Sequence, residues 1–221
     1  MHLTKLTFAT ISLAMIASAQ APLPTDHFFQ IRYASNLTAG DSVVNITNVG
    51  AVGAPLNGPG FGGSVGNICV NVYAFSPDEQ LISCCSCLIT PNGLVSLSAN
   101  NDLVSNTLTG VRPNSIVVKL LSTQPTSANN VDPTKSNCTQ SAATVLANQL
   151  ARGMVAWGTT LHAAPAPAGT FSLTETAFTL AELSAGELAS ITGRCTAIIG
   201  NGSTFGICRS CRPGGLGGSR L

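Results

Sequence analysis

Apolar and polar residues alternate along several short segments, and this pattern predicts a chain built mainly of β-strands. The clearest alternation covers residues 68–75, and a second apolar segment at 81–89 follows it after a polar turn at 76–80. A third segment at 94–98 follows the turn Thr90-Pro91-Asn92-Gly93, in which Pro and Gly stand at favoured turn positions. Together the three segments predict an antiparallel meander.

Four further strands are predicted where Val, Ile, Thr and aromatic residues cluster. They cover residues 43–49, 115–121, 153–162 and 171–180. Residues 28–33 are apolar enough to form an edge strand or a docked arm, and 101–108 are expected to form one or two helical turns.

One helix is predicted at 184–199. Ser184 and Glu187 have the spacing of a capping box. The apolar side chains that recur after them at helical spacing are Leu188, Ile191, Cys195 and Ile198. These elements together predict a mainly β fold: an antiparallel β-sandwich-like single domain, stabilised by disulfides, with one helix near its C-terminus.

The N-terminus has the composition of an export signal. Lys5 precedes the apolar stretch 6–17, and small residues end it at Ala17-Ser18-Ala19, which suits cleavage before Gln20. The stretch is too short to span a membrane. We therefore expect a protein secreted to the extracellular space or the periplasm. It would have a signal peptide at 1–19, one mostly-β disulfide-rich domain at 20–212 and a flexible Gly-rich tail at 213–221.

Composition narrows the possible partners. Charged residues make up only 9% of the chain, and its formal net charge is +1. Nucleic-acid binding is disfavoured, because it needs clustered Lys and Arg to displace counterions. Apart from the N-terminal stretch, no apolar run approaches the length of a membrane span. The expected partner is an extracellular or cell-surface ligand, with no nucleic acid, no membrane span and no cofactor.

Eight cysteines are expected to form the covalent framework, because disulfides persist in exported proteins. They are Cys69, Cys84, Cys85, Cys87, Cys138, Cys195, Cys208 and Cys211. If residues 76–80 form the hairpin turn, Phe75 faces Leu81 and Cys69 faces Cys87, so Cys69 is placed to bond Cys87, or Cys85 diagonally.

Side chains alternate along a strand, so Cys84 must point to the face opposite Cys85 and Cys87. The candidates to meet it there are Cys138, Cys195, Cys208 and Cys211. Cys195 itself lies on the apolar stripe of the predicted helix. We expect it to be buried against the strands and bonded to a cysteine there or to Cys138.

Two alternatives would make these cysteines chemically active. Cys85, Cys87, Cys208 and Cys211 could bind zinc, or Cys208-Arg209-Ser210-Cys211 could act as a thiol–disulfide motif. A zinc ribbon normally has two CxxC knuckles, and this chain has one. We therefore predict structural disulfides and no metal site.

A serine-hydrolase alternative depends on Gly62-Gly63-Ser64-Val65-Gly66, which matches GxSxG and precedes Asp132 and His162 in triad order. No helix is predicted after Ser64, and a glycine-rich loop produces this match by chance. We expect no catalytic residue and favour an extracellular binding or structural protein. The alternative is a secreted enzyme that uses Ser64, or a thiol or metal protein that uses Cys208 and Cys211.

The stretch 68–97, with Cys84-Cys85-Ser86-Cys87 followed by Thr90-Pro91-Asn92-Gly93-Leu94, resembles a group of uncharacterised exported bacterial proteins. The resemblance implies export and disulfide bonds, and it implies no activity. Eight cysteines are also found in hydrophobins, but those carry two Cys-Cys doublets and are about half as long, whereas this chain has only Cys84-Cys85.

Overall fold

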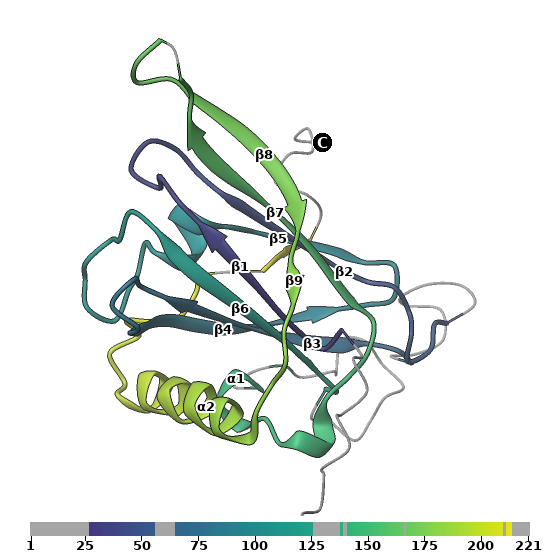
Figure 1. Cartoon of the computed structure of the whole chain (residues 1–221). Coiled ribbons are helices and arrows are strands. Elements are labelled where there is room, and N and C mark those ends of the chain that lie inside the picture. Colours follow the sequence, from purple (N-terminus) through teal and green to yellow (C-terminus); the bar gives the residue numbers. More distant parts are fainter. Residues whose placement is uncertain are drawn as a thin grey trace, which may run out of the picture.

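Two five-stranded sheets stack face to face, and a helix lies against the outer face of one of them (Figure 1). The computed structural model describes residues 27–55, 65–125, 138, 141–165, 167–209 and 211–213. All strand pairs in both sheets are antiparallel. The prediction of a mainly β, sandwich-like fold with one helix near the C-terminus is therefore confirmed.

The strand order is β4-β3-β6-β1-β9 in the first sheet and β10-β5-β2-β7-β8 in the second. The strands are β1 (Phe29–Ala34), β2 (Val43–Asn48), β3 (Ile68–Phe75), β4 (Leu81–Ile89), β5 (Leu94–Ser98), β6 (Ile116–Thr123), β7 (Met154–Ala163), β8 (Phe171–Ala177), β9 (Thr179–Leu180) and β10 (Arg212–Pro213). The helices are α1 (Ser141–Thr144) and α2 (Ala185–Gly200), with a π-helical turn at Ala99–Leu103 and a 3-10 turn at Ala147–Gln149.

The first sheet is covered on both faces, which explains why all eight residues of β3 are buried. Val70 and Val72 pack between the sheets, in the larger apolar core. Tyr73 and Phe75 point the other way, into a second core beneath the helices. Burial raises the pKa of the Tyr73 phenol, whose hydroxyl donates to the carbonyl oxygen of Ala142 at 2.7 Å.

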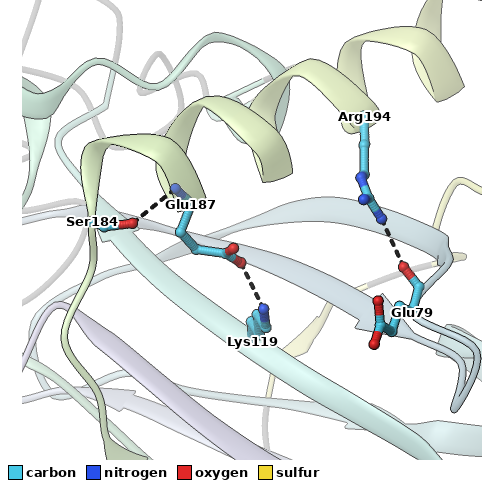
Figure 2. A network of polar contacts seen from close by, with 5 residues as sticks. All are labelled: Glu79, Lys119, Ser184, Glu187 and Arg194. Atoms are coloured by element: carbon cyan, nitrogen blue, oxygen red, sulfur yellow. Dashed lines mark hydrogen bonds and ion pairs between the residues drawn. The ribbon is translucent and has the colours of Figure 1, made fainter.

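Helix α2 begins with the Ser184 cap that its sequence predicts, but the Glu187 side chain pairs with Lys119 instead of completing the predicted capping box. Ser184 accepts a hydrogen bond from the backbone N–H of Glu187 at 3.0 Å, as Figure 2 shows. The Glu187 carboxylate in turn lies 2.6 Å from Nζ of Lys119 on β6. Further along the helix, Arg194 donates to the carbonyl oxygen of Glu79 at 2.7 Å. The buried side chains of the helix are Ile191, Cys195 and Ile198.

The predicted meander is wrong at its third strand. The turn at 90–93 does not return the chain beside β4 but carries it to the other sheet, where β5 pairs with β2 and β10. Val95 and Leu97 of β5 then face the inner apolar residues of the first sheet. The crossing places apolar side chains of β4 and β5 in one core. The alternation of apolar and polar residues cannot by itself distinguish this arrangement from a hairpin within one sheet.

Three other expectations are corrected in detail. The segment 171–180 forms two strands in different sheets, because the buried Phe178 separates β8 from β9. β1 is not an edge strand, since it lies between β6 and β9. The helical turn expected at 101–108 begins earlier, as the π-helical turn at 99–103. The strands expected at 43–49, 115–121 and 153–162 are confirmed as β2, β6 and β7.

Replacing Ile191 by Asp should detach α2 from the sheet. Ile191 is fully buried, and an unpaired carboxylate there would lower the free energy of unfolding by about 4 kcal/mol or more. Ala189→Asp is the matched control, because Ala189 is exposed on the same helix. Urea unfolding measures both variants. Equal stability of the two would contradict the observed packing of the helix.

Candidate functional site

All eight cysteines are bonded in four disulfides, and three of these bonds start from β4. The pairs are Cys69–Cys138, Cys84–Cys195, Cys85–Cys208 and Cys87–Cys211. Cys84 bonds the helix on the outer face of the first sheet, whereas Cys85 and Cys87 bond the C-terminal segment on the inner face. The prediction that Cys195 is buried and bonded to a sheet cysteine is confirmed.

The expected bond from Cys69 to Cys87 or Cys85 is wrong, because the hairpin register is shifted. Phe75 faces Leu81 as predicted, but an irregularity between Ala74 and Phe75 advances the pairing by one residue. Cys69 therefore faces Leu88, on the face opposite Cys85 and Cys87. A slip of one residue reverses which side chains share a face, so Cys69 bonds Cys138 on the helix side instead.

The C-terminal segment covers the open edge of β4. Its Gly206 carbonyl accepts from the backbone N–H of Cys84 at 2.8 Å, and the N–H of Cys208 donates back to Cys84 at 3.2 Å. The segment ends at β10, which pairs with β5 in the second sheet. It thus joins the edges of both sheets on one side of the sandwich.

The thiol–disulfide and zinc alternatives both need free cysteine thiols, and none of the eight cysteines is free. Cys208 and Cys211 are not bonded to each other but to Cys85 and Cys87, so no dithiol motif is present. Within the described ranges, no group of three or more His, Cys, Asp or Glu is arranged to hold a metal ion.

A hollow of about 320 Å³ opens on the other side of the sandwich, where β1 and β9 of the first sheet approach β7 and β8 of the second. Most of its lining residues carry a polar group, although apolar atoms make up the larger part of the exposed lining. These residues are Ile31, Arg32, Tyr33, Thr160, His162, Thr174, Thr176, Ala177 and Thr179. Tyr33 is 55% exposed, and Nε2 of His162 lies 2.8 Å from the hydroxyl of Thr174. Residues that carry hydroxyl, imidazole and phenol groups therefore line the hollow.

Arg32 of β1 links the two sheets beside this hollow, through hydrogen bonds to residues of β7 and β8. Its guanidinium donates to the carbonyl oxygen of Thr176 at 2.7 Å and to the hydroxyl of Thr160 at 2.8 Å. Burial lowers the pKa of Arg32, and the nearby Glu175 carboxylate acts in the opposite direction. The buried Nε has no hydrogen-bond partner among the described residues. A Cβ atom at Gly158 would lie only 2.6 Å from Nε of Arg32. The Arg32 side chain therefore packs closely against the β7 backbone at Gly158.

The hydrolase residues are not brought together by anything the structure describes. Ser64 and Asp132 lie outside the described residues. His162 lies on β7, and its hydrogen bond to Thr174 places it in the hollow. The sequence alone singles out His162, and the alternation at 171–180 places Thr174 and Thr176 on one face. No sequence pattern predicted that Arg32 and Tyr33, on the distant strand β1, would lie beside these residues.

No family model, curated protein or solved structure matches the chain. No helix in the described part of the chain is long and apolar enough to cross a membrane.

We predict that the mature protein, denatured without reductant, contains no titratable thiol. The four bonds join residues 69, 111, 123 and 124 positions apart, and closing loops of this length contributes about 4–5 kcal/mol each in the chain-entropy model. Reduction should therefore lower Tm by tens of degrees. Four free thiols with one bound zinc, or equal Tm values before and after reduction, would contradict the framework.

Gly158→Ala should destabilise the protein through Arg32. The new methyl group would collide with the pinned side chain and lower the free energy of unfolding by about 1–3 kcal/mol. In an Arg32→Ala background the same substitution should cost clearly less, because the obstructing side chain is gone. A double-mutant cycle by urea unfolding measures this coupling. Strictly additive effects would show that Arg32 does not hold this position.

Proposed function

We propose that the protein is an exported binding protein whose disulfide-locked sandwich supports a recognition site at the Arg32 hollow. In this proposal residues 1–19 are removed on export, 20–212 form one domain and 213–221 form a tail. Four disulfides are typical of proteins that work outside the cytosol. The resemblance of residues 68–97 to exported bacterial proteins supports the same location.

The lining of the hollow favours a neutral ligand rich in hydroxyl groups, such as a carbohydrate of a cell surface. The observation that carries this proposal is that Thr174, His162 and the exposed Tyr33 line one open hollow. Hydroxyl and imidazole groups exchange hydrogen bonds with sugar hydroxyls in both directions, and an exposed aromatic ring offers an apolar face to a sugar ring.

Charge supports a neutral ligand over an anion. The Arg32 guanidinium is engaged by Thr160 and Thr176 and lies near the Glu175 carboxylate. A bound phosphate or carboxylate would find these donors already engaged and the unpaired Nε buried, and it would meet repulsion from Glu175.

Tyr33→Ala should weaken binding of neutral oligosaccharides at least about fivefold, because it removes about 1 kcal/mol or more of ring contact. Titration calorimetry with a panel of neutral oligosaccharides measures the Kd. Phe205→Ala is the matched control, since Phe205 is similarly exposed, at 50%, but lies after α2 and away from the hollow.

Two results would overturn this proposal. One is the absence of binding to any neutral oligosaccharide, or binding that Tyr33→Ala and Phe205→Ala reduce equally. The other is labelling by a serine-reactive phosphonate that Ser64→Ala abolishes, which would establish the secreted-hydrolase alternative.

A further inference from the structure

Among the outermost strands of the two sheets, β8 alone presents a long uncovered edge within the described residues. The edge of β4 is bonded by the C-terminal segment, and β9 and β10 are two-residue strands. In contrast, all seven residues of β8 are exposed. Figure 1 shows β8 as the outer strand of a hairpin with β7 that extends beyond the neighbouring strands.

This edge lacks the features that normally keep a strand from pairing with another chain. Its sequence Phe-Ser-Leu-Thr-Glu-Thr-Ala contains no Pro and no Lys, and its pairing with β7 has no bulge. The one charge, Glu175, is drawn back over the sheet by Asn45, whose amide donates to it at 3.1 Å. Two apolar side chains are left in solvent: Leu173 is 60% exposed and Phe171 is 40% exposed.

We propose that β8 pairs antiparallel with β8 of a second copy of this chain, with the two-fold axis at Leu173. In this register Leu173 faces its own equivalent, Phe171 faces Glu175, and Ser172 faces Thr174. Leu161 of β7 lies beside Leu173 in the same sheet, so the axis gathers a small apolar cluster from both copies. The pairing stops before Thr176, because Arg32 already bonds its carbonyl oxygen.

The strand is complementary to itself, which favours a second copy over an unrelated peptide. No like charges face each other, the two hydroxyl pairs can exchange hydrogen bonds, and Leu173, the more exposed of the strand's two large apolar side chains, is buried at the axis. The Thr174 face carries the hollow and the Leu173 face does not. A two-fold axis perpendicular to the sheet therefore turns both hollows to the same side.

That arrangement gives the proposed binding function two sites that can engage one repetitive ligand, so the apparent affinity would exceed that of a single hollow. This consequence rests on the proposed function. The pairing itself does not, and it is tested without any ligand.

Sedimentation velocity of the full exported protein across a concentration series should show a monomer–dimer equilibrium. Leu173→Glu and Leu173→Lys each place like charges at the axis and should weaken the dimer about tenfold or more. Equimolar mixing of the two variants should restore a dimer, because Glu then faces Lys. Val111→Glu and Val111→Lys are the matched controls, since Val111 is 66% exposed in a loop away from β8.

Both Leu173 variants should keep the circular dichroism spectrum of the unchanged protein, because the side chain is exposed. A protein that remains monomeric at its highest soluble concentration would overturn the proposal. So would a dimer that the Leu173 variants do not weaken, or a mixture that does not recover. Sugar binding by a strictly monomeric protein would leave the proposed function standing while removing the pairing.

Discussion

Three disulfides leave the single strand β4 in two directions, and the arrangement of the layers depends on them. Cys84 reaches outward to α2, whereas Cys85 and Cys87 reach inward to the segment that ends at β10. Consecutive side chains on a strand point to opposite faces, so three nearly adjacent cysteines can fix a helix on one side and a closing segment on the other. The same strand therefore holds the helix layer, the sheet edge and the C-terminus.

The two sides of the sandwich are closed by different interactions, and the proposed binding surface lies on the side that is closed by polar side chains. On the β4 side the closure is covalent and the segment 204–209 occupies the edge. On the opposite side the closure is polar, through Arg32, with Gln30 donating to the carbonyl oxygen of Met154 at 2.9 Å. Because side chains rather than paired strands or a disulfide close this side, a hollow and a free strand edge remain there. Recognition is expected where the scaffold is rigid but its edge remains open.

Local patterns predicted what depends on local geometry. The alternation at 68–75 and the Ser184 cap were sufficient for β3 and α2 because period and capping are properties of neighbouring residues. The shift between Ala74 and Phe75 was not predictable in this way, and it alone changed the partner of Cys69. The hollow was also missed, since Arg32 and Thr176 meet only because the two sheets are stacked against each other. Alternation and capping patterns therefore do not predict how segments far apart in the sequence pair with each other.

The scarcity of charge links the disulfide framework to the two proposed surfaces. With only 9% charged residues, and with Lys119–Glu187 as the one ion pair found in the described residues, the fold gains little from electrostatic contacts and relies on apolar burial and covalent bonds. Such a surface repels neither a neutral polar ligand nor a second copy of itself, because long-range charge repulsion is weak. A hydroxyl-lined hollow and a nearly uncharged strand edge are both consistent with this condition. The low charge content is therefore compatible with both the disulfide framework and the two proposed modes of recognition, through hydroxyl groups and through backbone pairing.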